Sequence, residues 1–399
     1  MLRRALNVDE SPEVRRNITL VTGARLITNS SYRFTLPFLA IIAKGLDVNV
    51  AQFGVAIAVS ELVGLLAPFL GRTVDRLGQR AAMGMGLIGV AAGATLAAAS
   101  QNLFMFGLAL VLMGQSSILY LLGMGAWIAQ RVPYERRGRV TGITEISWAL
   151  GLLIGVSSLG LVTAATNWRV AYGLAAAATV AVAIAVIMRV EGAPAVRDID
   201  QPMIHAPIRL SRSAKLVLLG AFALTVASQS LFVTFGTWLK EEHGFSETTL
   251  SAMAFALGAG ELAASLLSAK YADRWGKERS MAWGAALMVP AAIALAVGHA
   301  TMAVGLIAFV VAIVGFEFSI VSAIPIGSQL IASSPARGLG LLIGAETLGR
   351  SFVSIPATRA YANHGMAWPA AICAVAATCT TLAVLAGHRA EHRAVPVTR

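Results

Sequence analysis

The chain has 399 residues, of which 57% are hydrophobic and only 13% are charged. Soluble domains usually carry about 25% charged residues, so this composition excludes an ordinary water-soluble protein and indicates a membrane protein. The formal net charge is +11, from 31 lysines and arginines against 20 acidic residues. Whether this charge marks a nucleic-acid surface depends on where it lies along the chain.

Apolar runs of about 20 residues, the length that crosses a bilayer as a helix, recur along the chain. They predict twelve membrane-spanning helices, at residues 18–43, 50–70, 82–99, 103–129, 138–162, 168–190, 214–239, 248–268, 280–298, 301–331, 338–361 and 367–387. The polar, proline-containing stretch 191–212 divides them six and six. The predicted domains are an N-terminal tail (1–17), a six-helix bundle (18–190), a linker (191–212), a second six-helix bundle (213–388) and a C-terminal tail (389–399).

The basic residues are divided unevenly between the two sides of the predicted membrane. With residues at the span ends counted with the adjoining loop, three lie inside spans, four lie in the odd-numbered loops, and the other 24 of the 31 lie in the tails and even-numbered loops. The positive-inside rule therefore predicts cytoplasmic tails and a cytoplasmic linker, in a multi-pass protein of the cytoplasmic (inner) membrane. The positive charge is explained by topology, so we expect a lipid bilayer around the protein and no nucleic-acid partner.

The two predicted bundles resemble each other at a constant offset. Residues 71–80 read GRTVDRLGQR and residues 269–278 read AKYADRWGKE, so that Asp273, Arg274 and Gly276 each lie 198 positions after a matching residue. The glycine pair 142 and 151 recurs at 340 and 349 with the same offset. Two unrelated motifs that share one offset indicate duplication of a six-helix unit.

The loop after the second span resembles a signature of the major facilitator superfamily, in which a glycine and three residues precede Asp-Arg-x-Gly-x-Arg. The matching residues are Gly71, Asp75, Arg76, Gly78 and Arg80. The resemblance implies the twelve-helix fold of that superfamily, an all-α membrane protein of two pseudo-symmetric six-helix bundles. It also implies that this loop and its second copy latch the two bundles on the cytoplasmic side.

The fifth span resembles that of the drug/proton antiporters in this superfamily. Four of their glycine positions are occupied, by Gly142, Gly151, Gly155 and Gly160, while Val156 stands where their proline would be. Small residues on one helix face allow close helix packing, which is the simpler interpretation of the same pattern. An arginine that many such antiporters carry in the fourth span is replaced by Leu110.

These resemblances predict a secondary active transporter that moves a small solute by alternating access. Proton-coupled efflux (antiport) is the favoured interpretation. Uptake of a small polar metabolite such as a sugar, proton-coupled or facilitated, is the alternative. The six histidines lie in loops, tails or span ends, and neither HExxH nor a phosphate-binding Gly-rich loop is present. We therefore predict no enzyme activity, no cofactor and no metal site. Nothing in the sequence requires more than a monomer.

Eight charged residues lie well inside the predicted spans, away from their ends, and each costs on the order of 3 kcal/mol to insert near the bilayer centre. They are Arg25, Arg33, Glu61, Glu145, Glu261, Glu317, Glu346 and Arg350. Such residues face a wet cavity or one another rather than lipid. Arg33 and Glu61 are predicted to lie at similar depth, where they could pair, and Glu346 and Arg350 are spaced to neutralise each other on one helix. Structural salt bridges are the alternative role for both pairs.

Five carboxylates against three arginines leave two carboxylates without a basic partner inside the membrane. An unpaired carboxyl in a low-dielectric site can hold a proton near neutral pH, which is what proton coupling requires. Glu145 is the first candidate because no basic residue lies within a turn of it on its own helix. Glu317, Glu261, Glu61 and Glu346 are the others. A protonated glutamate bonded to a backbone carbonyl is the structural alternative.

The predicted substrate path combines these charges with neutral polar side chains. Arg25, Asn29 and Arg33 recur every four residues, so they form one polar stripe on the first span. The fourth and seventh spans carry further hydrogen-bonding groups at similar depth. The candidates for the substrate path are Arg25, Asn29, Arg33, Gln115, Tyr120, Gln229 and Arg350. Such a lining suits a polar or amphipathic solute.

Overall fold

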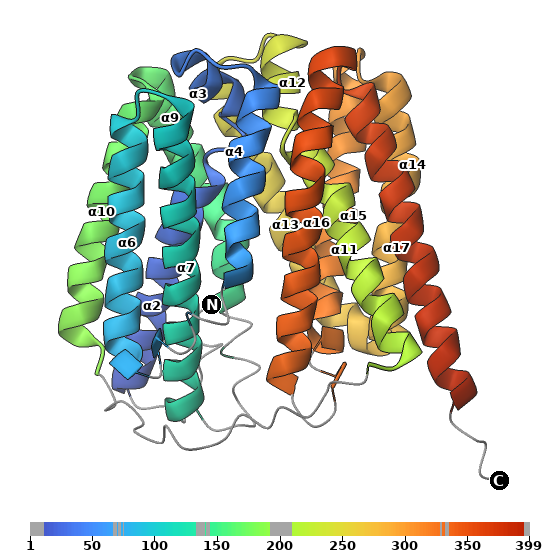
Figure 1. Ribbon diagram of the computed structural model, residues 1–399, viewed down its shortest axis with the longest axis horizontal. Helices are drawn as coiled ribbons and strands as arrows, with labels where there is room; N and C mark the ends of the chain where they lie inside the picture. The colour runs from blue at the N-terminus through green and yellow to red at the C-terminus, as the bar shows by residue number, and fades with distance from the viewer. Residues whose placement is uncertain are drawn as a thin grey trace. The chain divides into compact units, whose positions relative to one another are not determined.

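The computed structural model describes residues 12–66, 70, 73–74, 76–132, 140, 144–191, 210–327, 329–331 and 335–394 (Figure 1). Helices make up 89% of the structure, and no strand occurs in the described residues. The sequence prediction of an all-α protein is therefore confirmed.

The elements up to the linker follow the first six predicted spans in order. They are α2 (Pro12–Arg33), α3 (Leu39–Gly45), α4 (Val50–Val63), the short 3₁₀ helix η1 (Gly64–Leu66), α6 (Gln79–Ala99), α7 (Leu103–Arg131), the π-helical segment η2 (Gly151–Val156), α9 (Ser157–Ala165) and α10 (Trp168–Arg189). Helix also covers Thr144 to Leu150, directly before η2.

The remaining elements follow the last six predicted spans. They are α11 (Arg212–Phe232), α12 (Phe235–Glu241), α13 (Glu247–Trp275), α14 (Lys277–Gly298), α15 (Met302–Gly327), α16 (Pro335–His364) and α17 (Ala367–Ala394). Each predicted span thus coincides with a helix or with two or three consecutive helical segments.

Four of these helices begin at a side-chain cap. The side chains of Asn49, Asn102, Asn167 and Ser211 accept hydrogen bonds from N–H groups in the first turns of α4, α7, α10 and α11. Such a cap satisfies a donor that the helix start leaves free and contributes about 1 kcal/mol. The caps explain why these helices start within two residues of the predicted positions.

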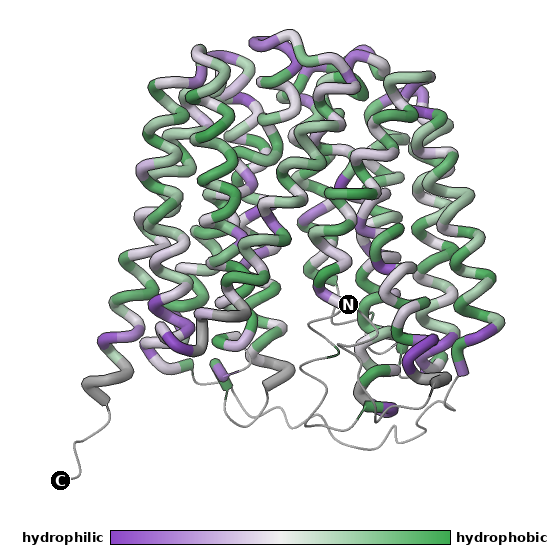
Figure 2. Tube along the Cα trace, turned by 180° about the vertical axis from the view of Figure 1, so that it is seen from behind, coloured by the Kyte–Doolittle hydropathy of each residue, from purple (hydrophilic) through white to green (hydrophobic). Residues whose placement is uncertain are grey.

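Nine of the described helices are long and apolar enough to cross a membrane, and the pair of α3 with α4–η1, bent by 108°, passes the same test together. The long helices α2 and α16 are not among the nine because charged residues along them lower their hydropathy. Hydrophobic residues dominate the helical shafts and hydrophilic ones gather at helix ends (Figure 2). These features agree with a polytopic membrane protein.

The contacts divide the chain into two compact units. Unit 1 comprises residues 1–35, 66–202 and 246–258, and unit 2 comprises residues 36–65, 203–245 and 259–399. In unit 1, α2, α6, α7 and α10 enclose a core that includes Ile18, Leu87, Trp127 and Val186. In unit 2, α11 packs against α16 and α17, α14 packs against α15 and α17, and α4 packs against α16. The two predicted six-helix bundles are not tested by this division and stay a prediction.

The first and seventh predicted spans are each broken near the same end. α2 and α3 are separated by a turn at residues 34–38, and α11 and α12 by a turn at residues 233–234. Leu36 and Thr234, which lie in these turns, are 198 positions apart, the offset of the sequence repeat. Pro37 explains the first break because proline cannot donate a helical hydrogen bond. No proline accompanies the second.

Within unit 2, the two short helices that follow these breaks pack together at a glycine. A Cβ atom placed on Gly236 of α12 would stand 2.6 Å from the Leu36 carbonyl oxygen, and it would also meet the oxygen of Pro37. Only glycine leaves room for this approach of two backbones. The contact joins α12 to the chain that leads into α3.

The repeat is also visible in how helices pack within each unit. A Cβ on Gly86 of α6 would stand 2.7 Å from the Ser116 carbonyl oxygen of α7, and a Cβ on Gly284 of α14 would stand 2.6 Å from the Gly315 oxygen of α15. Gly86 and Gly284 are 198 positions apart. A small residue therefore permits the same close helix crossing in both copies.

Candidate functional site

In unit 1, Arg25 on α2 forms a two-pronged ion pair with Glu145. Nη1 and Nη2 of Arg25 each donate to one carboxylate oxygen, and both distances are 2.8 Å. The Arg25 side chain is 9% exposed and that of Glu145 is 43% exposed. The prediction that Glu145 lacks a basic partner is wrong, because its partner comes from another helix, 120 positions away. Paired guanidinium–carboxylate bonds of this kind are among the stronger polar contacts in proteins.

Two turns along the same helix, Arg33 is held by Trp148. Nη1 of Arg33 donates to the Trp148 carbonyl oxygen at 2.9 Å, and the guanidinium lies 4.5 Å from the centroid of the indole ring. The ring face attracts the cation electrostatically. The sequence analysis did not single out Trp148. Its position three residues after Glu145, on the same helix, was the available signal.

Asn29 lies between these two arginines on α2. Its Nδ2 atom is buried and has no hydrogen-bond partner among the described residues. A Cβ on Gly151 would stand 3.0 Å from the Cβ of Asn29, so the amide side chain lies beside η2. The polar stripe predicted on the first span therefore faces the fifth span in unit 1, as the contacts of all three residues show.

The glycines of the fifth span have a packing role in this arrangement. A Cβ on Gly155 would overlap the Ser30 side chain, and the Ser30 hydroxyl donates to the Gly151 carbonyl oxygen at 3.2 Å. The segment is π-helical from Gly151 to Val156. Such segments often occur at functional sites in membrane and soluble proteins. Gly160 is buried in α9, and Gly142 lies outside the described residues.

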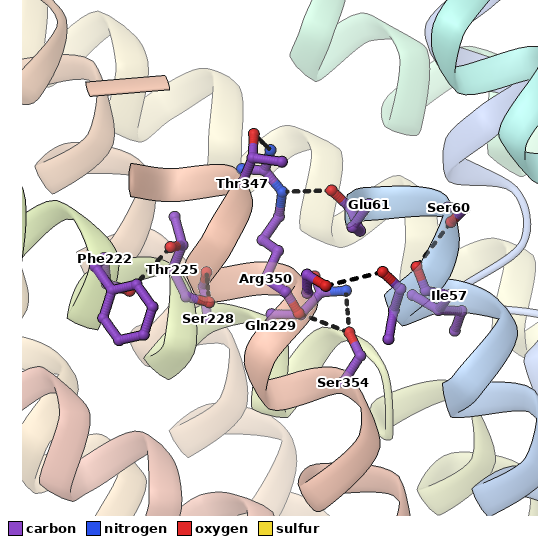
Figure 3. A network of polar contacts seen from close by, with 12 residues as sticks. Ile57, Ser60, Glu61, Phe222, Thr225, Ser228, Gln229, Thr347, Arg350 and Ser354 are labelled. Carbon is purple, nitrogen blue, oxygen red and sulfur yellow. Dashed lines mark hydrogen bonds and ion pairs between the residues drawn. The ribbon is translucent and has the colours of Figure 1, made fainter. Parts of the chain in front are cut away.

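In unit 2, a second ion pair joins α4 to α16. Nε of Arg350 donates to Oε2 of Glu61 at 2.9 Å, and its Nη2 donates to the Thr347 hydroxyl at 3.2 Å (Figure 3). One turn further along α16, the Ser354 hydroxyl accepts from Nε2 of Gln229 on α11 at 3.3 Å. Arg350 and Gln229, both predicted to face the substrate path, therefore belong to one polar network.

We use the term α4–α16 seam for the contacts of Gly54, Ala58 and Glu61 with Thr358, Ser351 and Arg350. The Ser351 hydroxyl donates to the Ala58 carbonyl oxygen at 2.8 Å. A Cβ on Gly54 would overlap the Thr358 side chain, so glycine lets the helices approach closely there. The seam thus combines close packing, a neutral hydrogen bond and an ion pair along one line of contact.

Glu346 lies one turn before Arg350 on α16, beside this seam. Its Oε1 atom is buried and has no hydrogen-bond partner among the described residues. The hydrogen bonds described for Arg350 go to Glu61 and Thr347, while its charge also acts on the Glu346 carboxyl, so the predicted neutralisation of Glu346 stays a prediction. Arg33 and Glu61 belong to different units, so the pairing predicted between them stays a prediction.

Two more predicted carboxyls are buried in unit 2, on α13 and α15. Glu261 is 1% exposed and Glu317 is 3% exposed. The Ser265 hydroxyl, one turn after Glu261, donates to Oε1 of Glu317 at 2.7 Å. Ser268 and Ser322 continue this polar contact between the two helices, with hydroxyl oxygens 3.0 Å apart.

Tyr120, predicted to line the substrate path, lies in the core of unit 1. It is 1% exposed, and its hydroxyl donates to the Val21 carbonyl oxygen at 2.5 Å. Tyr120 therefore ties α7 to α2 through a buried hydrogen bond. Gln115, five residues earlier on α7, is half-buried.

The predicted latch motifs are described only in part. Gly71 and Asp75 lie outside the described residues, as does the side chain of Asp273. Gly78 and Gly276 directly precede α6 and α14, and their φ angles are +81° and +87°. Residues other than glycine rarely adopt this backbone conformation. Arg76, Arg80 and Arg274 are exposed. The repeated glycine of the motif is therefore required by its backbone.

The family profile of the Major Facilitator Superfamily matches residues 21–358. The chain is 23% identical over 252 residues to an uncharacterised MFS-type transporter, YwfA, of Bacillus subtilis, covering 61% of each chain. It is 26% identical over 153 residues to the multidrug resistance protein MdtG of Salmonella choleraesuis, covering 37% of this chain and 38% of that protein. These matches thus span less than two thirds of the relatives' own length.

Solved structures of similar fold cover nearly the whole chain. A bacterial homologue of the human lysosomal transporter Spinster, in an inward-facing and unoccupied conformation, matches with a TM-score of 0.74 at 13% identity, over 95% of both chains. The human organic anion transporter MFSD10 matches with a TM-score of 0.65 at 19% identity, over 95% of this chain and all of that one. At such low identity the likeness concerns the fold. The profile match over most of the chain establishes that it belongs to the Major Facilitator Superfamily.

Proposed function

We propose that this protein exports a small solute across the cytoplasmic membrane by alternating access, in exchange for protons. Membership of a family of secondary transporters supports transport. The glycines of the fifth span and the similarity to a multidrug resistance protein favour export. The distribution of basic residues favours cytoplasmic termini, which puts α3 and α12 toward the opposite side. A monomer with one substrate path is the simplest form of this proposal.

The proposal of proton coupling rests on the position of Glu346 beside the Arg350–Glu61 pair. A buried carboxyl oxygen without a donor is a place where a proton can reside, because the neutral acid avoids burying a charge. When Glu346 carries the proton, Arg350 stays with Glu61. When the proton leaves, the Glu346 carboxylate competes with Glu61 for the same guanidinium. Gain and loss of one proton thereby change the strength of the α4–α16 seam.

This competition links a proton to a conformational change if the two six-helix bundles are divided as predicted. In that division α4 belongs to the first bundle and α16 to the second, so the α4–α16 seam would join them. Rocking of one bundle against the other has to separate the contacts along this seam. Deprotonation of Glu346 would weaken the Arg350–Glu61 ion pair of the seam. Gly54, which leaves room for close packing, would allow α4 and α16 to come together again.

The solute is expected to interact with the polar stripe of α2. Asn29 offers a buried amide donor without a partner, and it lies between the Arg25–Glu145 pair and the guanidinium of Arg33 over Trp148. An indole face with a cation beside it suits a solute that has both apolar surface and hydrogen-bond acceptors. Glu145 is partly exposed, so solvent, a proton or a cationic group of the solute can reach it.

The direction of coupling can be tested in proteoliposomes that contain a pH-sensitive dye and start without a pH gradient. Each compound from a panel of toxic compounds and sugars is added outside. Antiport carries protons out as solute enters and makes the lumen more alkaline, whereas proton-coupled uptake makes it more acidic. Solute flux without any pH change would rule out proton coupling and leave facilitated transport.

The role of Glu346 is tested in the same vesicles with Glu346→Gln. We expect this variant to bind solute and exchange it across the membrane but to move no protons. Glu191→Gln, which alters an exposed carboxylate after α10, is the matched control and should behave like the unaltered protein. Proton movement that is unchanged in Glu346→Gln and lost in Glu145→Gln would transfer the role to Glu145.

A further inference from the structure

A cluster of titratable side chains lies at the end of unit 2 opposite to the C-terminal end of α17, next to α12 (Figure 1). We call Glu241, Glu242, His243, His299 and Tyr361 the rim cluster. None of these residues belongs to the polar networks described above. They come from the end of α12, the turn between α14 and α15, and the last turn of α16.

Glu242 is the centre of the rim cluster. Its Oε2 atom lies 3.0 Å from Nδ1 of His299, and its Oε1 atom accepts the Met366 backbone N–H at 3.3 Å. The side chains of His299 and Glu242 are 25% and 26% exposed, so protons from the solvent can reach them. One carboxylate thus joins α12 both to the α14–α15 turn and to the start of α17.

The other members of the cluster surround this carboxylate. The buried Tyr361 lies close enough to Glu241 and Glu242 to interact with both carboxylates. Nε2 of His243 donates to the His299 carbonyl oxygen at 2.9 Å, and the His243 ring packs edge-on against Trp238 at 5.0 Å between centroids. On helix α3, another neighbour of α12, Lys44 is exposed, as is Asp47 just after its end.

These contacts hold α12 at both of its ends. At its start, the Thr234 hydroxyl lies 3.5 Å from the sulfur of Met366, the same residue whose N–H binds Glu242 at its end. Between them, Gly236 packs on the chain leading into α3. The turn at residues 233–234 separates α12 from α11.

We propose that the rim cluster is a regulatory proton site that holds α12 more firmly in mildly acidic surroundings, separately from any transported proton. Histidine ordinarily changes charge between pH 5 and 8. When His299 is protonated, its bond to the Glu242 carboxylate is charge-assisted and stronger. At higher pH the histidine is neutral and the hold on α12 weakens. At pH values low enough to protonate the carboxylates, the ion pair is lost again.

The effect on transport rests on the proposed function, which puts α12 on the side facing away from the cytoplasm. A firmly held α12 favours closure of the path on that side. Acidic surroundings outside would therefore slow each transport cycle even when the pH difference across the membrane is kept constant. Such a site would protect a proton-driven exporter from running while external protons are abundant.

How strongly the rim cluster stabilises the position of α12 can be measured by hydrogen exchange, without any substrate. Hydrogen exchange of the purified full-length protein is followed in peptides covering residues 233–245 and 360–370 at pH 5.5 and 7.5, and is expressed as protection relative to the intrinsic rate. We expect protection to be about fivefold higher at pH 5.5, the factor that a partly exposed ion pair provides. Peptides from α6 report whether the fold as a whole is unchanged.

Two variants identify the titrating group. His299→Gln and Glu242→Gln should each remove the pH-dependent difference, while His364→Gln, which alters an exposed histidine at the same end of α16, should keep it. A pH-dependent difference that persists in His299→Gln, or higher protection at pH 7.5 than at pH 5.5, would overturn the proposal. If no solute is transported at all, the proposed function fails while this exchange result still decides the role of the rim cluster.

Discussion

The guanidinium of Arg350 on α16 donates from Nε to Oε2 of Glu61 on α4 at 2.9 Å, although the two residues are 289 positions apart in the chain. The side chains are 31% and 12% exposed, so the pair is largely shielded from solvent. The neighbouring residue of α16, Ser351, adds a hydrogen bond to the Ala58 carbonyl oxygen. A charged and a neutral contact therefore lie side by side in the α4–α16 seam, and each can be altered separately.

We expect Glu61→Gln and Arg350→Gln each to lower the stability of the purified protein by about 1–3 kcal/mol, because each leaves a partly buried charge without its partner. The double variant Glu61→Gln with Arg350→Gln should lose less than the sum of the two single losses, because removing both partners leaves no charge unpaired. Thermal unfolding in detergent gives the three values and hence the coupling between the residues. Losses that simply add in the double variant would show that the pair contributes nothing of its own.

The Arg25–Glu145 pair gives a second prediction, on transport. Lysine is a compact charge that cannot reproduce the two parallel bonds of arginine. We therefore expect Arg25→Lys to transport more slowly than the unaltered protein but faster than Arg25→Gln, in which the charge is gone. Initial rates of solute uptake into proteoliposomes measure this order. Lys215→Gln, at an exposed position near the start of α11, controls for loss of a positive charge. Equal, reduced rates in both Arg25 variants would mean that the charge by itself contributes nothing, and rates equal to that of the unaltered protein would mean that the pair is not used.

The third prediction concerns the contact of α12 with the chain before α3. Gly236→Ala forces a methyl group onto the backbone oxygens of Leu36 and Pro37, which cannot move aside as a side chain could. We expect a lower midpoint of thermal unfolding and greater accessibility of a cysteine introduced in α3. Gly344→Ala, where nothing lies within 4 Å of the new methyl group, should be neutral or stabilising by up to about 1 kcal/mol. The idea of a close backbone contact fails if both variants unfold alike.

The fourth prediction separates backbone conformation from packing in the latch motif. Gly276 has φ +87° and ψ 133°, a region that is essentially restricted to glycine, and nothing lies within 4 Å of a Cβ placed there. Gly276→Ala and Gly276→Asn should both cost about 1–3 kcal/mol. Asparagine brings no relief, because the conformation it tolerates is the left-handed helical one. Gly173→Ala in α10 is the control with equal space and helical backbone. Thermal unfolding that is unaffected by either Gly276 variant would contradict this account.

The order of the helices could be predicted from the sequence because hydropathy is a property of consecutive residues. Each predicted span coincides with helical segments, and the capped helices start where predicted. The breaks in the first and seventh spans were not predicted, because a run of apolar residues does not show where a helix ends and the chain changes direction. Pro37 offered a signal for one break, whereas the turn at residues 233–234 has no proline and follows from tertiary packing.

The partners of the buried charges could not be predicted in the same way. Glu145 was expected to lack a basic neighbour because only its own helix was considered, and Arg25 reaches it from α2. Arg350 was assigned to Glu346 on its own helix for the same reason, whereas Glu61 was assigned to Arg33 on another helix from similar depth alone. The polar stripe of α2 was predictable because residues four apart share a helix face. Which helix that face meets depends on packing, which spacing does not encode.

The wide separation of Glu61 and Arg350 along the chain has a consequence for biogenesis. Ribosomes add roughly 5–20 residues per second, so α4 reaches the membrane about 15–60 seconds before α16 has been made. During that interval the insertion machinery, water or a bound proton has to accommodate the Glu61 carboxylate. A cell that synthesises this protein therefore contains a partly assembled intermediate in which Glu61 of α4 has not yet paired with Arg350. Quality-control proteases would encounter that intermediate before the complete protein.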